Sequence, residues 1–274
     1  MNANPPFVAP YVPQIRLYTQ WLEKRHGLRF GDYQALWRWS VTELDAFWAS
    51  MWEYLDLQSP TPHTAVLARN TMPGAVWFPG AQVNYAQQVL RHVGPAHEAG
   101  MPAIIGDNEK GQRREMSWPE LRRQVAALAR HLQAQGVRPG DRVAVLSKNV
   151  SNIFEVQFAC WKLGAVFVPL NWRLVPDELE FILKDSGTTV LFYGEEFLPT
   201  VTELQSRGDR TDVAHWIHVG DPANTPPFAR EFNELVDPQP VTEPTITAFN
   251  DDLLYTMYTS GTTGLPKGVM HTHN

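Results

Sequence analysis

Two short apolar runs decide the fold: Arg142-Val-Ala-Val-Leu-Ser147 and Ala165-Val-Phe-Val-Pro-Leu170, with residues 152–163 between them. Each run is long enough for a strand, and the segment between them predicts a helix that Gly164 ends. Neither run alternates with polar residues, which is typical of strands covered on both faces. A strand, a helix and a second strand at this spacing indicate a right-handed parallel unit.

The same alternation continues in both directions along the chain. Downstream, residues 176–184 predict a helix, and residues 188–193 and 216–219 predict strands. Upstream, Ser117 and Glu120 form the capping box of a helix. Its predicted buried face consists of Leu121, Val125, Leu128 and Leu132. We therefore expect an α/β domain over residues 96–274, a parallel sheet flanked by helices, with a loop-rich connection over residues 221–250.

The first 95 residues differ in composition and are rich in tryptophan. Ser40 and Glu43 predict a capping box, followed by a helix with Leu44, Phe47, Trp48 and Met51 on one face. The proline and glycine residues of segment 72–80 predict an irregular connection pinned by Trp77 and Phe78. A helical, aromatic-rich region over residues 1–95 is thus expected before the α/β domain.

Composition narrows the classes of function. The chain has 274 residues, 43% of them hydrophobic and 19% charged, as expected of a globular protein. A formal net charge of −6 and the lack of a basic cluster argue against a nucleic-acid surface. No stretch approaches the ~20 apolar residues needed to span a bilayer. Cys160 is the one cysteine, so no internal disulfide forms, and we expect a cytoplasmic protein with a buried, inert thiol there.

The stretch that carries chemistry is Tyr258-Thr-Ser-Gly-Thr-Thr-Gly-Leu-Pro-Lys-Gly268, directly after an apolar run that predicts a strand. Its glycines allow close approach of the backbone to a ligand, and successive N–H groups in such a turn bind anions. Hydroxyl groups add donors, and the lysine adds a compact positive charge. These features predict a site for ATP phosphates formed by Thr259, Ser260, Gly261, Thr262, Thr263, Gly264 and Lys267.

These residues also allow other interpretations. The stretch is not a Walker A loop, because Pro266 precedes the lysine and a strand-like segment, not a helix, follows it. A flexible surface loop would also contain such residues. His271 and His273 have the spacing of a metal-binding pair but no cysteine or aspartate partner beside them, so we expect no metal site. The sequence contains no Gly-x-Ser-x-Gly motif, the pattern that would indicate a serine hydrolase.

The motif from Tyr258 to Gly268 resembles the phosphate loop of the adenylate-forming (AMP-binding) superfamily, which includes acyl-CoA synthetases. Segments 136–143 and 163–171 resemble its early strands and helix. Segments 21–27, 35–40, 46–48 and 73–86 resemble acetoacetate–CoA ligases and, more distantly, acetate–CoA ligases. Segment 171–179, in contrast, is more similar to ligases of fatty and aryl acids.

The resemblance implies a ligase that joins a carboxylic acid to CoA. The acid attacks ATP, with Mg²⁺ bridging the phosphates, and the thiol of CoA then displaces AMP. Acetoacetate or another short-chain acid is the expected substrate. The family's catalytic residues are expected downstream and none within this chain, which suggests an inactive N-terminal fragment. Two alternatives stay open: a truncated product without function, and a nucleotide-binding or dimerisation module. The sequence does not indicate an oligomeric state.

Overall fold

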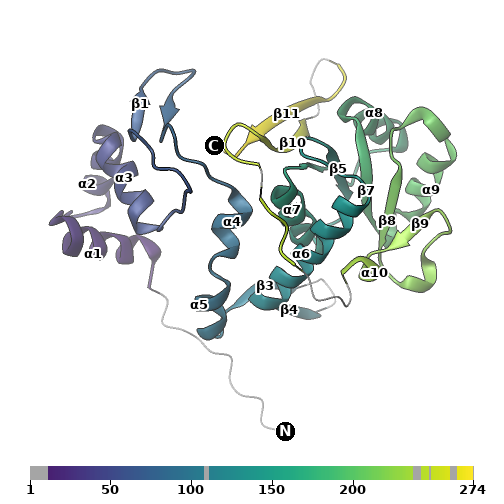
Figure 1. Cartoon of the computed structure of the whole chain (residues 1–274), viewed down its shortest axis with the longest axis horizontal. Helices are drawn as coiled ribbons and strands as arrows, with labels where there is room; N and C mark the ends of the chain where they lie inside the picture. Colours follow the sequence, from purple (N-terminus) through teal and green to yellow (C-terminus); the bar gives the residue numbers. More distant parts are fainter. Residues whose placement is uncertain (1–11, 108–110, 237–241, 247, 260–263, 274) are drawn as a thin grey trace, which may run out of the picture. The chain divides into compact units, whose positions relative to one another are not determined.

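The computed structural model describes residues 12–107, 111–236, 242–246, 248–259 and 264–273 (Figure 1). Contacts divide the chain into two compact units, residues 1–82 and 83–274. The sequence-based boundary near residue 95 stays a prediction. Within the described residues, no helix combines the length and the hydropathy needed to cross a membrane.

The first unit is a small helical body with an aromatic core. Tyr18 and Leu22 are buried there, and Tyr18 donates to or accepts from the hydroxyl of Ser50 at 2.6 Å. Aromatic rings from all three helices pack against this cluster. The elements are α1 (Gln14–His26), α2 (Tyr33–Thr42), α3 (Leu44–Tyr54), β1 (Leu67–Arg69) and β2 (Val76–Trp77).

The predicted capping box at Ser40 is wrong. Ser40 lies inside α2 and donates its hydroxyl to the carbonyl of Trp37 at 2.7 Å. Helix α2 is instead capped by Asp32, whose carboxylate accepts the N–H of Ala35 at 2.8 Å. Helix α3 begins one residue after Glu43, so the predicted pattern spans the junction of two consecutive helices. Such a junction has the same apolar period as one helix, which is why the sequence pattern misplaced the start.

Segment 72–80 is irregular as predicted, except for the two residues of β2, which pair with β1. Its aromatic residues hold it to α3. Trp77 contacts Trp48 edge to face with ring centroids 5.6 Å apart, and Phe78 lies 4.7 Å from Trp52. The connection is therefore held both by ring packing against α3 and by the short backbone pairing of β2 with β1.

The second unit contains the predicted α/β architecture. Its helices are α4 (Tyr85–Leu90), α5 (Val93–Glu98), α6 (Trp118–Ala134), α7 (Asn152–Leu163), α8 (Pro176–Ser186), α9 (Leu198–Ser206) and α10 (Asn233–Val236). Its strands are β3 (Pro102–Asp107), β4 (Arg113–Ser117), β5 (Arg142–Leu146), β6 (Val166–Pro169), β7 (Thr188–Gly194), β8 (His215–Val219), β9 (Ala229–Glu231), β10 (Leu253–Thr259) and β11 (Lys267–Thr272). Strands β3 and β4 form a separate hairpin.

Seven strands form the main sheet in the order β11-β10-β6-β5-β7-β8-β9. All neighbours are parallel except β10 and β11, which form an antiparallel hairpin at one side. The chain runs from β5 to β6 on one side and then crosses over to β7 on the other side. The carboxyl ends of β5 and β7 therefore define a topological switch point, where sheets of this kind commonly bind ligands.

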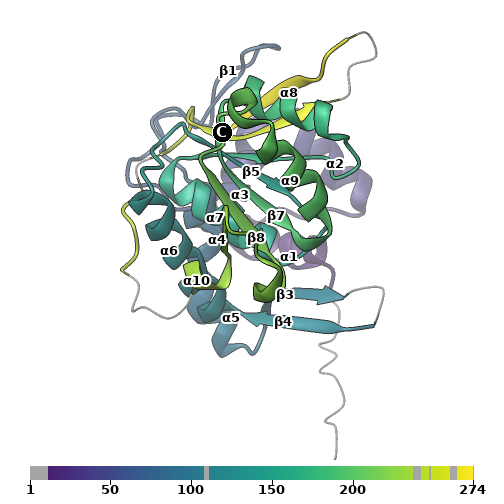
Figure 2. The same ribbon diagram turned by 90° about the vertical axis from the view of Figure 1, so that its right-hand side faces the viewer.

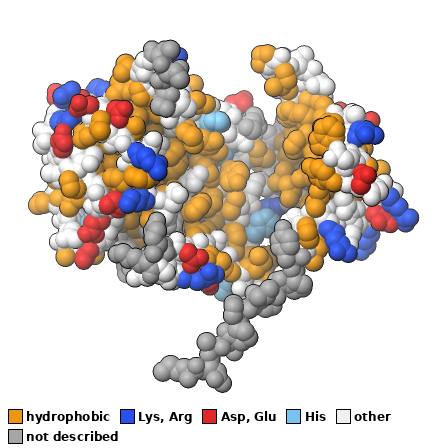
Figure 3. Space-filling model, turned by 180° about the vertical axis from the view of Figure 1, so that it is seen from behind, with side chains coloured by type: hydrophobic (Ala, Val, Ile, Leu, Met, Phe, Trp, Pro, Cys, Tyr) orange, Lys and Arg blue, Asp and Glu red, His pale blue; other side chains and the backbone are white. Residues whose placement is uncertain are grey.

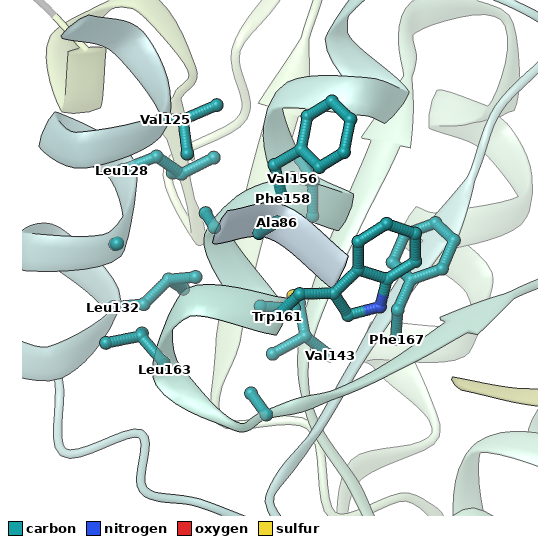
Figure 4. Packing of buried hydrophobic residues seen from close by; sticks show 14 of the residues in the cluster. Ala86, Val125, Leu128, Leu132, Val143, Val156, Phe158, Trp161, Leu163 and Phe167 are labelled. Carbon is teal, nitrogen blue, oxygen red and sulfur yellow. The ribbon is translucent and has the colours of Figure 1, made fainter. Parts of the chain in front are cut away.

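Helices cover both faces of this sheet, which explains its uninterrupted apolar strands (Figure 2). Along β5, Val143 and Val145 belong to the cluster that includes α6 and α7, while Ala144 and Leu146 belong to the cluster that includes α8 and α9. Figure 4 shows the first cluster, in which Leu128 and other side chains of α6 point toward α7.

Helix boundaries with strong capping signals agree with the predictions. Ser117 caps α6 by accepting the N–H of Glu120 at 3.3 Å, and α7 ends at Gly164 in the left-handed region, with φ 73°. The loop-rich expectation for residues 221–250 misses β9 and α10. These elements have three and four residues, too few for a period to show.

Candidate phosphate-binding site

The predicted phosphate loop joins the two strands of the β10–β11 hairpin. Ser260, Gly261, Thr262 and Thr263 lie outside the described residues, so the structure does not place them. The residues on either side are placed: Thr259 ends β10, Lys267 begins β11, and the two are register partners. The hydroxyl of Thr259 lies 3.5 Å from the carbonyl oxygen of Lys267 and donates to it. The ladder thus brings the two ends of the motif together.

The surroundings of Lys267 differ from those of a Walker A lysine. The side chains of Thr259 and Lys267 are both exposed, as is Gly264. Lys267 begins a strand, so its ammonium group acts without the dipole of a helix N-terminus. A compact cation beside a hydroxyl and a glycine-rich turn suits the oxygens of a polyphosphate.

A second feature lies on the same edge of the sheet. Because β5, β6 and β10 are parallel, their carboxyl ends share one edge. Just after β6, the ring of Trp172 has the guanidinium carbon of Arg173 4.1 Å from its centre, and the ammonium of Lys148, just after β5, 5.5 Å from its centre. Trp172 is 38% exposed. A partly exposed aromatic ring with two cations close to it suits a nucleotide.

A pocket of about 290 Å³ lies at the switch point between β5 and β7. Its lining mixes both signs of charge with amides and a hydroxyl, and includes Arg114, Ser147, Asn152, Gly194, Glu196 and Glu231. Lysine and arginine side chains are also interspersed with acidic ones on the face seen in Figure 3. The pocket therefore has no single charge that would select a polyphosphate, unlike the motif on β10 and β11.

His271, His273 and Cys160, the other candidate residues of the sequence, have surroundings unlike those of a metal site or a reactive thiol. The ring of His271 stacks on Tyr255 with centroids 4.5 Å apart, and Nδ1 of His273 accepts the N–H of Tyr85 at 3.1 Å. Among the described residues, no group of three or more His, Cys, Asp or Glu side chains could hold a metal ion. Cys160 is buried, and burial raises the pKa of its thiol far above the usual range.

Sequence reasoning missed one residue near the motif, Asp185. Its carboxylate accepts a hydrogen bond from the phenol of Tyr258, the first residue of the motif, at 2.6 Å. Asp185 lies 73 positions earlier, at the end of α8, and no local pattern connects the two. Arg142 was predicted only as the start of a strand. Its guanidinium group donates a hydrogen bond to the carbonyl oxygen of Ser186, the residue after Asp185.

The fold is an α/β sheet that carries a glycine- and hydroxyl-rich motif on its β10–β11 hairpin, and comparison with known proteins shows the family. Residues 91–274 match the family described as "AMP-binding enzyme", and residues 33–89 match "Acetyl-coenzyme A synthetase N-terminus". The chain belongs to the AMP-binding enzyme family.

Individual relatives agree with this assignment. The acetoacetyl-CoA synthetase from Streptomyces lividans superposes with a TM-score of 0.80 at 33% identity, over 94% of this chain and 41% of that one. The acetoacetyl-coenzyme A synthetase of Rhizobium meliloti is 27% identical over 93% of this chain and 40% of its own length. The fatty acid–[acyl-carrier-protein] ligase ScoC of Streptomyces coeruleorubidus is 39% identical over 65% of this chain and 31% of its own length. The chain thus spans less than half the length of these relatives.

Proposed function

We propose that this chain provides the ATP-phosphate-binding part of an ATP-dependent acid–CoA ligase. The observation that supports it best is the pairing of Thr259 with Lys267 at the base of the predicted loop. This pairing keeps a hydroxyl and a cation on the two sides of a segment rich in glycine and hydroxyl groups. In a ligase of this family, a carboxylate attacks the α-phosphate of ATP, and pyrophosphate leaves.

The role of the loop follows from the charges involved. Two anions, the acid and ATP, must approach each other, so catalysis depends on positioning and on neutralisation of the phosphates. We assign Lys267 to the β- and γ-phosphates, together with Thr259, Ser260, Gly261, Thr262, Thr263 and Gly264. Mg²⁺ prefers substrate phosphates with few protein ligands, which fits a site without an acidic cluster among its described residues. When bound, the ion would supply further neutralisation of the phosphates.

We further propose that the nucleotide of CoA stacks on Trp172. CoA carries an adenine ring and three phosphate groups, and the ammonium of Lys148 and the guanidinium of Arg173 both lie close to the indole ring. Stacking of a base on an aromatic ring typically contributes about 1–3 kcal/mol, and the two cations would contact the phosphates. This stacking platform, formed by Trp172 with Lys148 and Arg173, lies on the same sheet edge as the carboxyl end of β10.

For the acid, we propose acetoacetate or another short-chain substrate. The support is the similarity to acetoacetyl-CoA synthetases over nearly the whole chain, including the match to an acetyl-coenzyme A synthetase N-terminus. A feruloyl-CoA synthase of an Amycolatopsis species is more similar, at 43% identity, but over only 58% of the chain. The proposed place of action is the cytoplasm.

Calorimetric titration with MgATP tests the phosphate site. We expect the chain to bind MgATP and Lys267→Ala to weaken binding by roughly 10- to 150-fold, the value of a charged hydrogen bond. Lys24→Ala, an exposed lysine in the first unit, is the matched control and should bind like the unmodified chain. Equal affinities for Lys267→Ala and Lys24→Ala would exclude the proposed role.

Exchange of labelled pyrophosphate into ATP by a full-length ligase that contains residues 1–274 tests the chemistry and the acid, because this chain spans less than half the length of its ligase relatives. Faster exchange with acetoacetate than with ferulate or palmitate supports the short-chain assignment, and the reverse order overturns it. Binding of MgATP without exchange for any acid would instead indicate a nucleotide-binding module without catalysis. Neither binding nor exchange would favour a product without function.

A further inference from the structure

The part of the hairpin that carries the phosphate loop extends beyond its main support. Strand β10 pairs with β11 along its whole length, from Leu253 to Thr259, but its register with β6 is at Tyr255, opposite Phe167. Tyr258 and Thr259 lie further along, toward the loop. Figure 2 shows this end of the hairpin reaching past the rest of the sheet. Its orientation must therefore depend on side chains.

Tyr258 provides such a contact. Its phenol donates a hydrogen bond to the carboxylate of Asp185 at 2.6 Å, and its ring packs on the apolar cluster under α8 and α9. Burial raises the pKa of Tyr258, and the charge of Asp185 raises it further. The phenol therefore keeps its proton, which makes it a permanent donor to the carboxylate.

The acceptor is itself held in place. Arg142 of β5 donates to the carbonyl oxygen of Ser186 at 2.5 Å and to that of Gly187 at 3.1 Å. These two carbonyls directly follow Asp185 at the C-terminus of α8. The guanidinium group thus fixes the end of the helix to a central strand, and Asp185 with it. A continuous chain of bonds leads from β5 through Asp185 to the first residue of the motif.

Gly268 completes the arrangement from the opposite strand. It is the register partner of Tyr258. A Cβ atom on Gly268 would lie 2.8 Å from Cγ2 of Thr256 and 3.2–3.3 Å from the ring of Tyr258. Gly268 is not among the glycines with positive φ, so space and not backbone conformation requires the missing side chain. The ring of Tyr258 lies across the position that any other residue would fill.

We propose that Asp185 is a positioning residue for Thr259 and Lys267, the two placed ends of the predicted phosphate motif. It acts through Tyr258, whose ring requires a glycine at position 268, and it sets the direction in which the end of the hairpin presents Thr259 and Lys267. The anchoring itself follows from the geometry, while its consequence for ATP rests on the proposed function.

The test combines four variants with two measurements. Tyr258→Phe removes the donor, Asp185→Ala removes the acceptor, the double variant removes both, and Asp185→Asn keeps an acceptor without the charge. Amide hydrogen exchange of peptides covering residues 253–259 and 264–273 reports on the anchor, and calorimetric titration with MgATP reports on its use. Asp212→Ala, which removes an exposed carboxylate paired with Lys184 near α8, is the control.

We expect Tyr258→Phe and Asp185→Ala each to speed exchange in these peptides and to weaken MgATP binding about 2- to 10-fold, as for loss of one hydrogen bond. The double variant should be no worse than either single one, because both remove the same interaction. Asp185→Asn should restore most of the affinity, and Asp212→Ala should change neither measurement.

The outcomes also separate the anchor from the proposed function. Additive effects in the double variant, or unchanged exchange in the hairpin, would overturn the anchoring. If the unmodified chain bound no MgATP while exchange still responded as expected, the anchor would stand and the proposed function would fail. Normal MgATP binding by a variant with fast hairpin exchange would refute the positioning role of Asp185.

Discussion

Lys162 of α7 forms an ion pair with Glu243, 81 positions later in the chain. The lysine side chain is 5% exposed, and Arg122 of α6 bonds the other carboxylate oxygen at 2.7 Å. One carboxylate thus joins two helices to the segment that precedes β10. Burial lowers the pKa of Lys162, although the contact with Glu243 opposes this shift.

Removing this carboxylate should destabilise the second unit strongly. Glu243→Gln leaves the buried ammonium of Lys162 without a counter-charge, a change that typically costs about 3–5 kcal/mol. Denaturant unfolding measures the loss. The double variant Lys162→Met with Glu243→Gln should recover most of the stability, because no buried charge is left unpaired. A double variant no more stable than Glu243→Gln would contradict this account.

The buried carboxyl group of Glu155 should make the folded protein less stable as pH rises. Burial raises its pKa from 4.5 to about 7, against the smaller opposing effect of Arg114, and both carboxylate oxygens lack hydrogen-bond partners among the described residues. Glu120 adds to the shift and Arg123 opposes it. The folded state binds the proton of Glu155 more tightly than the unfolded state does. The contribution of this proton to the free energy of unfolding is therefore complete below pH 4.5 and is lost as pH rises through 7.

The raised pKa of Glu155 corresponds to about 3 kcal/mol of stability lost between pH 4.5 and pH 7. Denaturant unfolding at pH 5 and pH 8 measures it. Glu155→Gln cannot ionise and should be more stable than the unmodified chain at pH 8, with a flatter pH profile. A profile that Glu155→Gln leaves unchanged would show that other groups control the pH dependence.

Gly268→Ala should disturb the hairpin by overpacking. The added methyl group meets Thr256 and the ring of Tyr258, and such crowding typically costs about 1–3 kcal/mol. Thr256→Ser removes the methyl group at the shortest contact, so it should relieve part of the defect. Thermal unfolding of the single and double variants measures both effects. Equal melting temperatures for Gly268→Ala with and without Thr256→Ser would argue against steric crowding.

Trp172→Ala should weaken binding of CoA while leaving MgATP binding unchanged. Loss of one stacked base corresponds to about 1–3 kcal/mol, or roughly 5- to 150-fold in affinity. Calorimetric titration with CoA measures it, and Trp37→Ala, an exposed tryptophan of the first unit, is the control. If Trp172→Ala weakened MgATP and CoA binding equally, the platform would not be specific for CoA.

The sequence predicted those parts of the fold in which local signals and burial agree. The helix between Asn152 and Leu163 combines a capping glycine with an apolar period, and the parallel sheet follows from strands covered on both faces. Short elements such as β9 have too few residues for a period. The start of α3 was misplaced because two helices follow each other with one residue between them.

Prediction of the site was limited in a different way. The motif predicts which of its own residues bind phosphate, because the signal is local in the sequence. The anchor between Asp185 and Tyr258 joins residues 73 positions apart. They meet only in the folded protein, where α8 and Tyr258 pack on the same apolar cluster. Ser260, Gly261, Thr262 and Thr263 lie outside the described residues, so their assignment to ATP phosphates stays a prediction.

The hairpin surface leads to a last prediction, on association. Within the described residues β11 pairs only with β10, so its other edge offers free backbone groups. The side chains of Met257, Leu265, Val269 and Met270 are 44–66% exposed. An apolar edge strand of this kind is a template for pairing with another chain, and natural proteins often block such edges with lysine. We therefore expect the chain to bind a hydrophobic dye and to associate at micromolar concentration.

Sedimentation velocity and dye fluorescence test this, with Val269→Lys and Met270→Lys as variants. Each should reduce both association and dye binding, because a charged side chain on the edge opposes pairing. Met72→Lys is the control, since Met72 is 88% exposed but lies in the first unit, in the connection between β1 and β2 and not in a strand. A monomeric, dye-silent chain would show that the edge does not promote association. If Met72→Lys were as effective as Met270→Lys, general solubility and not the hairpin edge would explain the effect.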